Sequence, residues 1–451
     1  MEEFINQITE QMRCVRAREY VARELRDHIT DQAAAYEEKG VSCEEAIKEA
    51  LREMGDPVEV GMELDRIHRP QTDYVMVGMA FLFSLGGMVV LYMAGGLAEA
   101  PIEFSRQCIY LLLSFGVMAG IYFLDYTIIG RYPYVAAVLT MALFIIGVAI
   151  PTMTGHIGKV PETQILAYLY VPVFAGILYR LRGKGYRAVT VAMAVEVAMA
   201  IVICGLATLH TALAVYGMCL VLLLLAIRKG WFVVRKNVAS ALAVAVLVVL
   251  PLGLAAAGLF FSWNEDSFRV MRVRAYLNPE QYAGGAGYVY QYIRELLGAA
   301  KFIGASDLST YMESGSMSGF YIYRSEPFIL LQLVSRYGIL AGVLVVFAFA
   351  AVTVHAFHIV RRQKNQLGSM VSIACFMVFL VNCTEGVLMN TGYYPVTSMQ
   401  FPFVSYGVGA SVTYAVLIGL LLSIYRNEKI VAECMAEHRA AWRLSIKIEK
   451  R

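Results

Sequence analysis

Long apolar runs constrain the fold of this chain more than any other feature of its sequence. From Tyr74 onward they recur, and each approaches the roughly 20 residues that a helix needs to cross a bilayer. About ten membrane-spanning helices are therefore predicted. Their expected ranges are 74–96, 107–129, 133–151, 164–181, 187–209, 211–228, 237–261, 328–357, 368–390 and 404–425. Only 16% of the residues are charged, against about 25% in soluble proteins, so we expect an all-α polytopic membrane protein.

Basic residues gather in every second loop between these runs. The basic loops contain Arg131, then Arg180, Arg182, Lys184 and Arg187, then Arg228, Lys229, Arg235 and Lys236, and then Arg361, Arg362 and Lys364. The intervening loops, near 97–106, 152–163, 210 and 391–403, are poor in lysine and arginine. Because cytoplasmic loops carry the excess of positive charge, the pattern predicts that both termini are cytoplasmic. The same parity places the long loop 262–327 outside.

The loop 262–327 is the longest polar interruption between the apolar runs. Loops well beyond about 15 residues are usually functional or disordered. This one carries aromatic residues such as Tyr276, Tyr288 and Tyr290, which a solvated linker rarely does. We therefore expect a folded loop or re-entrant segment at a membrane face.

Residues 1–70 are predicted to form a small, separate cytosolic domain of three helices. Apolar residues recur at helical spacing over the first forty residues, which indicates one long amphipathic helix. Ser42 with Glu45 gives a capping-box pattern that opens a second helix, and Asp56 before Pro57 opens a third. Because such short helices bury only a small core, we expect this domain to dock on a partner, whose identity the sequence leaves unknown.

The segment 427–451 is a basic tail in which apolar and basic residues interleave. A helix lying on the anionic inner leaflet and a solvated charged tail both remain open for it. The 8 cysteines include no Cys-x-x-Cys pair and the 7 histidines no His-x-x-x-His spacing. Neither a disulfide framework nor a metal site formed by these residues is expected.

Three motifs stand in order within residues 71–426. They are Arg269, Arg272 and Arg274 followed by Leu277-Asn278-Pro279-Glu280, then Phe328-Ile329-Leu330 with Tyr337-Gly338, then Pro402-Phe403-Val404-Ser405-Tyr406-Gly407. With the helix count and the large loop after the seventh helix, this order resembles the SEDS family (shape, elongation, division and sporulation proteins), of which RodA and FtsW are members. Residues 1–70 resemble the cytosolic prefix domain of some bacterial permease-like proteins.

The resemblance implies a multi-pass protein of the bacterial plasma membrane that acts in cell-wall biogenesis. Members of the family polymerise the lipid-linked disaccharide precursor of peptidoglycan into glycan strands. They work beside a partner transpeptidase, a class B penicillin-binding protein. No nucleic-acid partner is implied.

The resemblance also suggests which residues form the site. The family's catalytic aspartate directly precedes the Phe-Ile pair that opens the eighth helix, and Pro327 stands there in this chain. Glu326 is then the candidate general base, since a carboxylate can take the proton of an acceptor hydroxyl. A divalent cation is the one cofactor that it would hold. The candidate substrate-binding residues are Arg269, Arg272 and Arg274, which would pair with the lipid pyrophosphate, and Glu385, Asn390 and Ser405.

Two other functions stay open. Proline can neither take a proton nor bind a metal, and Leu166 stands where the family has a lysine. A catalytically inactive membrane scaffold with a similar fold would show such changes. A transporter of the lipid-linked precursor would also place helices around a polar cavity. Glu385 lies within an apolar run, where it would line a cavity or serve as a structural carboxyl.

Overall fold

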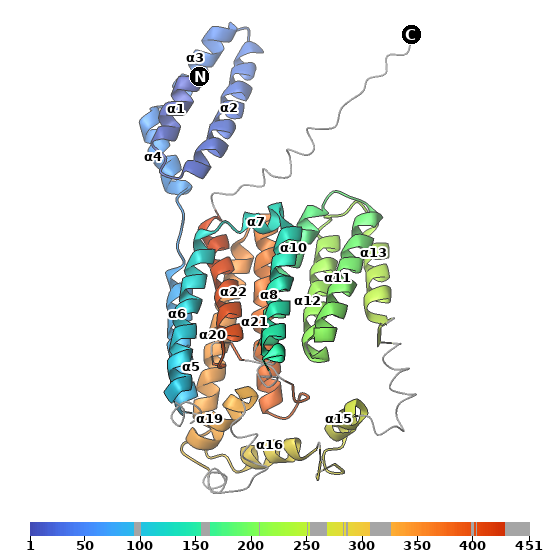
Figure 1. Cartoon of the computed structure of the whole chain (residues 1–451). Helices are drawn as coiled ribbons and strands as arrows, with labels where there is room; N and C mark the ends of the chain where they lie inside the picture. The colour runs from blue at the N-terminus through green and yellow to red at the C-terminus, as the bar shows by residue number, and fades with distance from the viewer. Residues whose placement is uncertain are drawn as a thin grey trace, which may run out of the picture. The chain divides into compact units, whose positions relative to one another are not determined.

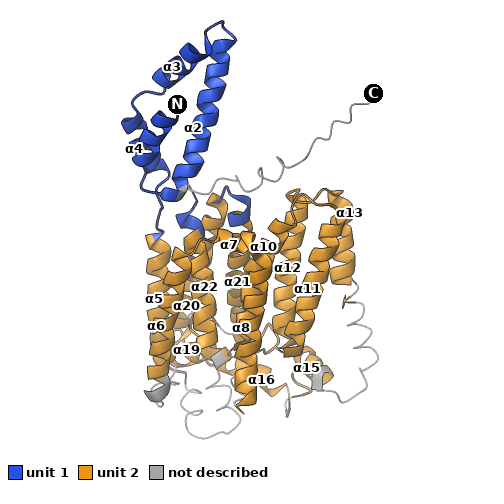
Figure 2. Cartoon of the chain, turned by 45° about the horizontal axis from the view of Figure 1, so that its top comes forward, with its two compact units in different colours: residues 1–73, 363–368, 424–451 blue, residues 74–362, 369–423 orange. Residues whose placement is uncertain are grey.

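The computed structural model describes residues 1–93, 101–154, 163–206, 208–249, 251–252, 268–282, 284–285, 287–306, 326–397, 401–402 and 404–428. Every regular element within these residues is a helix, which confirms the predicted all-α class. The chain divides into two compact units. One comprises residues 1–73, 363–368 and 424–451, and the other comprises residues 74–362 and 369–423 (Figure 2).

The N-terminal module has four helices rather than the predicted three (Figure 1). They are α1 (Glu2–Glu10), α2 (Val15–Glu37), α3 (Cys43–Glu53) and α4 (Pro57–Ile67). The prediction of one long first helix is wrong because the chain turns between α1 and α2, where Met12 is fully buried. The turn folds α1 back along α2, so that Arg26 pairs with Glu2 at 2.7 Å. A continuous helix would carry the buried Ile5 and Ile8 away from this core.

The starts of α3 and α4 follow their sequence signals to different degrees. Asp56 caps α4 as predicted, because its carboxylate accepts a hydrogen bond from the Val58 N–H at 3.2 Å. Before α3, the Ser42 hydroxyl donates to the Glu45 carboxylate at 2.8 Å, and its side chain makes no bond to the backbone of the first turn. The expected capping box is therefore replaced by a contact between the two side chains.

The second unit contains the membrane helices. Among the described residues, 8 helices are long and apolar enough to cross a bilayer. They are α5 (Tyr74–Met93), α6 (Pro101–Phe123), α8 (Pro133–Met153), α11 (Tyr186–Leu206), α12 (Leu209–Arg228), α20 (Ile339–Arg362), α21 (Gln366–Asn390) and α22 (Val408–Arg426). Two predicted runs hold shorter apolar helices, formed by η2 (Gln164–Leu169) with α10 (Tyr170–Arg180) and by α13 (Lys236–Val244) with η3 (Ala245–Val249). The polytopic architecture is confirmed.

The eighth predicted run, 328–357, is not one helix. It consists of η4 (Glu326–Phe328), α19 (Ile329–Tyr337) and α20. Gly338, between α19 and α20, has a φ of +99°, and a Cβ atom there would come within 2.6 Å of the Phe302 carbonyl oxygen. The Ile339 N–H donates across this break to the Lys301 carbonyl oxygen at 3.0 Å. The prediction of a single helix is wrong because a segment remote in sequence packs against this glycine.

The described helices between α13 and α20 lie across one end of the helix bundle. Helices α15 (Phe268–Leu277), α16 (Tyr288–Gly298) and α19 lie at the end opposite α7 (Thr127–Arg131) (Figure 1). The α16 residues Ile293 and Leu296 are buried in one cluster with Phe328 and Ile329 at the start of α19. The described part of loop 262–327 is thus folded, as its aromatic content predicted.

Candidate functional site

The connection that follows α21 folds back over the end of its own helix. Gly392, with a φ of +79°, turns the chain, and the Tyr393 N–H donates to the Leu388 carbonyl oxygen at 2.9 Å. This return brings the Tyr394 hydroxyl to Glu385, to whose Oε1 atom it donates at 3.3 Å. A carboxylate within an apolar helix is therefore covered by a polar residue of the following loop.

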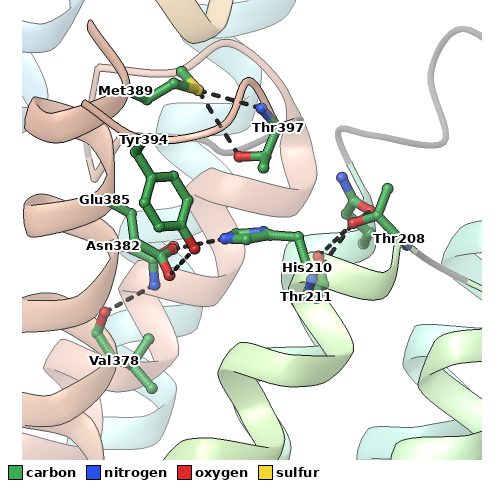
Figure 3. A network of polar contacts seen from close by, with 10 residues as sticks. Thr208, His210, Thr211, Val378, Asn382, Glu385, Met389, Tyr394 and Thr397 are labelled. Carbon is green, nitrogen blue, oxygen red and sulfur yellow. Dashed lines mark hydrogen bonds and ion pairs between the residues drawn. The ribbon is translucent and has the colours of Figure 1, made fainter. Parts of the chain in front are cut away.

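The second partner of Glu385 comes from α12. His210 stands in the first turn of that helix, and its Nε2 atom lies 3.0 Å from Glu385 Oε2 (Figure 3). Thr208 caps the helix, and Gln164 of η2 accepts hydrogen bonds from the Thr208 amide at 3.3 Å and hydroxyl at 3.1 Å. The side chains of His210 and Glu385 are each 14% exposed. The pair is therefore largely enclosed, and η2 fixes the helix start that presents His210.

Tyr394 lies against both members of this pair. Its ring meets the His210 ring edge-on, with 5.8 Å between the ring centroids. Burial, and then the neighbouring Glu385 carboxylate, raise the pKa of Tyr394 to about 12. The phenol therefore keeps its proton at physiological pH and stays a hydrogen-bond donor to Glu385. We call His210, Glu385 and Tyr394 the α12–α21 network.

A cavity lies beside the 391–397 connection. It has a volume of about 450 Å³ and is lined by Arg272, Val273 and Tyr276 of α15, Val289 and Tyr290 of α16, and Pro395 and Val396. Tyr276 donates from its hydroxyl to the Tyr393 carbonyl oxygen at 3.0 Å, and the Val396 N–H donates to the Tyr290 hydroxyl at 3.2 Å. This size is typical of a small-molecule site, and one polar connection borders both the cavity and the α12–α21 network.

The three predicted arginines lie in different environments. Arg272 is exposed and lines the cavity. Arg274 is half-buried on the same helix, and it is absent from the cavity lining because residues two apart on a helix do not share a face. The side chain of Arg269 lies outside the described residues. Arg272 is therefore the one of the three that the described structure brings to the cavity.

Residues around the predicted catalytic position are held by hydrogen bonds between their backbone and the Asn390 side chain. Glu326 begins η4, and its side chain lies outside the described residues. The Pro327 carbonyl oxygen accepts a hydrogen bond from Asn390 Nδ2 at 2.9 Å, and the Leu331 N–H donates to Asn390 Oδ1 at 3.0 Å. Asn390 Nδ2 also donates to the Gly386 carbonyl oxygen at 2.9 Å. Asn390, predicted to bind substrate, thus uses its amide group to fasten the start of α19 to the end of α21.

Ser405 lies away from the Arg272 cavity. It is 3% exposed, and its hydroxyl has no hydrogen-bond partner among the described residues. It lines a separate cavity of about 30 Å³ with Ser84 of α5, Gln107 of α6 and Ser411 of α22. Gln107 accepts a hydrogen bond there from the Gly407 N–H at 3.1 Å. A polar space of this size holds about two water molecules.

His210 and Tyr394 were not predicted from the sequence. The available signal was a histidine at the start of an apolar run, in a loop otherwise free of charge, but nothing local shows that it faces Glu385. The described residues contain no group of three or more His, Cys, Asp or Glu side chains that could hold a metal ion. A divalent cation at Glu326 stays a prediction, because that side chain is not described.

The fold and the site define a class of protein: an all-helical polytopic membrane protein with a cavity at one end of the bundle whose lining includes Arg272. The model of a known family, described as cell cycle protein FtsW/RodA/SpoVE, matches residues 165–430, which is more than half of the chain. The chain belongs to this family, and the predicted SEDS membership is confirmed.

Individual relatives are distant. The chain is 22% identical to the probable peptidoglycan glycosyltransferase FtsW of Trichlorobacter lovleyi, over 46% of this chain and 58% of that protein. It is also 22% identical to the protein of the same description from Enterococcus hirae, over 78% of this chain and 91% of that one. One solved structure is described as structural coordination of polymerization and crosslinking by a peptidoglycan synthase complex. Its match covers 79% of this chain and 98% of the chain in that structure. Its TM-score is 0.58 at 16% identity, which shows a shared fold.

Proposed function

We propose that this chain is a membrane glycosyltransferase that polymerises lipid-linked disaccharide into glycan strands during bacterial cell-wall biogenesis. The observation that carries the proposal is the cavity of about 450 Å³, lined by Arg272, at one end of the helix bundle. Family membership, and the activity for which its curated relatives are named, support the same function.

The cavity suits a ligand that combines sugar and phosphate. Tyr276 and Tyr290 present aromatic rings, which offer apolar faces for stacking on a sugar and hydroxyl groups for hydrogen bonding. Arg272 presents a guanidinium group, which pairs with phosphate oxygens in a bidentate manner. In the reaction, negative charge develops on the departing lipid pyrophosphate. Arg272 stabilises this charge, so its contribution is larger in the transition state than in the bound substrate.

The experiment that tests this function uses the purified full-length protein, its transpeptidase partner and a fluorescent lipid-linked disaccharide. Glycan strands are expected, and Arg272→Ala is expected to slow their formation by on the order of 10²-fold. The matched control is Arg294→Ala, which removes an exposed arginine of α16 outside the cavity lining and is expected to leave the rate unchanged. A wild-type protein that makes no strands with this partner would contradict the proposal.

The cavity is proposed to lie on the outer side of the bacterial plasma membrane. In support, Arg131 in α7 and the turns after α10 and α12, which hold Lys184 and Lys229, stand at the end of the bundle opposite α15 (Figure 1). In a cysteine-free variant, a cysteine replacing Gln281 is expected to react with an impermeant thiol reagent in cells stripped of their outer barrier. A cysteine replacing Lys184 is expected to stay unlabelled, and the opposite pattern would reverse the orientation.

Two partners are proposed. The solved structure of similar fold is described as a complex that coordinates polymerization and crosslinking, which supports a class B penicillin-binding protein as partner in the membrane. The four-helix module at 1–70 is proposed to bind a cytosolic protein of unknown identity. Deleting residues 1–68 is expected to leave a membrane unit that still inserts and makes glycan strands. A truncated chain that aggregates would show that the module is part of the membrane fold.

Pro327 favours a second candidate function, a catalytically inactive scaffold. A proline side chain cannot accept a proton, and the Pro327 backbone is tied to Asn390. The decisive variant is Pro327→Asp, which restores the carboxylate that the family resemblance places there. An inert wild type that gains activity through this substitution would favour the scaffold.

A further inference from the structure

An ionised Glu385 determines which ring nitrogen of His210 carries the proton. An ionised carboxylate only accepts hydrogen bonds, so His210 Nε2 then donates to Glu385 Oε2 across the 3.0 Å contact. In the neutral imidazole the lone pair then lies on Nδ1. Within the part of the chain that the structure describes, Nδ1 makes no hydrogen bond. Nδ1 is therefore the atom of His210 that can accept a proton, and it has no partner within these residues.

Glu385 is itself held on both oxygens. One oxygen accepts from His210, and the other accepts from the Tyr394 hydroxyl at 3.3 Å. Tyr394 also packs edge-on against the imidazole ring (Figure 3). An ionised carboxylate that is fixed in this way sets the tautomer of the histidine. The same arrangement prepares a histidine for general base catalysis in other enzymes.

The position that the family resemblance assigns to the base is occupied differently in this chain. Pro327 offers no proton acceptor on its side chain, and its carbonyl oxygen is used by Asn390. The α12–α21 network, by contrast, offers an oriented acceptor next to the connection that borders the Arg272 cavity. Tyr394 belongs to the network, and the next residues along the chain, Pro395 and Val396, line the cavity.

We propose that His210 is the general base of the glycosyl transfer, with Glu385 as the residue that positions it. The proposal rests on the function proposed above. Nδ1 takes the proton of the acceptor hydroxyl while an electron pair of that oxygen forms a bond to the anomeric carbon of the donor. The bond from this carbon to the lipid pyrophosphate breaks, and the pyrophosphate leaves with the electron pair beside Arg272. The imidazolium then releases its proton to water.

The groups around His210 determine how the reaction responds to pH. Glu385 of α21 and Tyr394 contact it, and Tyr168 of η2 lies within electrostatic range of both of these. Tyr276 of α15 lies within range of Tyr394. Tyrosines are neutral in the physiological range, so among these groups the Glu385 carboxylate is the charge that faces the ring. The rate is expected to fall at acid pH, because an imidazolium cannot accept the acceptor's proton.

The test compares two substitutions with a matched control in the full-length protein with its transpeptidase partner. His210→Gln keeps an amide N–H that can reach Glu385 but removes the accepting nitrogen. We expect its rate of strand formation to fall on the order of 10²–10⁴-fold. The affinity of the variant for lipid-linked disaccharide is expected to stay unchanged. Glu385→Gln keeps the shape and removes the charge, which is expected to lower the rate less and to move the acid fall to lower pH. His358→Asn, on an exposed face of α20, is expected to match the wild type.

Rates are measured from about pH 5 to 8, where histidine ordinarily changes its charge. Loss of the acid fall in His210→Gln supports the proposal, since a purely structural role would lower the rate equally at every pH. An active wild type whose rate and pH profile survive His210→Gln overturns the proposal and leaves the proposed function intact. A loss of activity in Glu326→Gln alongside an active His210→Gln also overturns it and assigns the base to Glu326.

Two further results are decisive. A wild-type protein that is inert with its partner overturns the proposed function, and the assignment of the base falls with it. If His210→Gln elutes as an aggregate or unfolds at a much lower temperature than wild type, its low activity does not identify the base. The pH profile of the Glu385→Gln variant is then the test of the proposal. A Glu385→Gln profile identical to that of the wild type then overturns the proposal.

Discussion

Glu385 and Glu196 both lie within membrane helices, and the structure surrounds their carboxylates differently. Glu385 of α21 accepts hydrogen bonds from His210 and Tyr394, and 14% of its side chain is exposed. Glu196 of α11 is 2% exposed, and neither of its carboxylate oxygens has a hydrogen-bond partner among the described residues. Tyr170 of α10, within electrostatic range of Glu196, is also buried with an unpartnered hydroxyl.

This difference separates a built site from a buried polar residue. Both carboxylates stand in apolar runs, where an ionisable residue is a functional hypothesis by default. The partners of Glu385 come from two separate parts of the chain, α12 and the connection 391–397, which converge on it. No comparable convergence surrounds Glu196 in the described residues. Convergence of donors, rather than burial of an acid, is what makes the α12–α21 network the candidate site.

The largest expected effect is a pair of opposite changes in stability. Glu385→Leu leaves His210 Nε2 and the Tyr394 hydroxyl without their acceptor, and unsatisfied buried groups cost about 1–3 kcal/mol each. Glu196→Leu removes a buried polar group that has no partner, and this substitution is expected to stabilise the fold by roughly 1 kcal/mol or more. The measurement is the midpoint of thermal unfolding in detergent for both variants beside the wild type.

Matched variants sharpen this test. Glu385→Gln retains an acceptor and is expected to lose less stability than Glu385→Leu. Glu196→Gln retains the buried polar group and is expected to gain less than Glu196→Leu. Equal shifts of the thermal midpoint, with the same sign, in the two leucine variants would show that the different surroundings of the two carboxylates do not affect stability.

A smaller effect on stability is expected when the two buried asparagines of α21 are replaced by alanine. Asn390 joins its own helix to the start of α19 through Pro327 and Leu331, whereas Asn382 donates within its own helix to the Val378 carbonyl oxygen at 2.8 Å. Hydrogen bonds within membrane proteins contribute about 0.6 kcal/mol each. Asn390→Ala is therefore expected to cost about 2 kcal/mol and Asn382→Ala about 0.6 kcal/mol. Thermal unfolding checks the order, and equal costs would contradict a fastening role for Asn390.

The sequence predicted the membrane helices well because hydropathy is a local property. Every predicted run contains a helix, and the capping of α4 follows from Asp56 and Pro57 alone. Predictions failed where a distant segment decides the local backbone. Gly338 looks like one more glycine in an apolar run, yet contacts with residues 301–304 end α19 there. The turn at Met12 likewise follows from packing of the whole N-terminal module.

The candidate site was predicted only in part for the same reason. Arg272 was identified through the family resemblance and Glu385 as a charge within an apolar run, and both signals are visible in the sequence. His210 was missed because its partner Glu385 lies 175 residues away, and no local pattern connects them. Ser405 and Asn390 belong to motifs of the family resemblance, but the structure places one beside a separate cavity and ties the other to the backbone.

The smallest expected effect concerns the hydroxyl of a tyrosine beside each carboxylate. Tyr394→Phe removes a donor to Glu385 and is expected to cost about 0.5–1.5 kcal/mol. Tyr170→Phe removes a hydroxyl without a described partner and is expected to cost nothing or to stabilise slightly. Because the pKa of folded Tyr394 is about 12, above its ordinary value near 10, its stabilising contribution is complete below about pH 10 and is lost as the pH rises to about 12. The gap in thermal midpoint between wild type and Tyr394→Phe is therefore expected to close over this range, and a gap that stays constant would contradict the raised pKa of Tyr394.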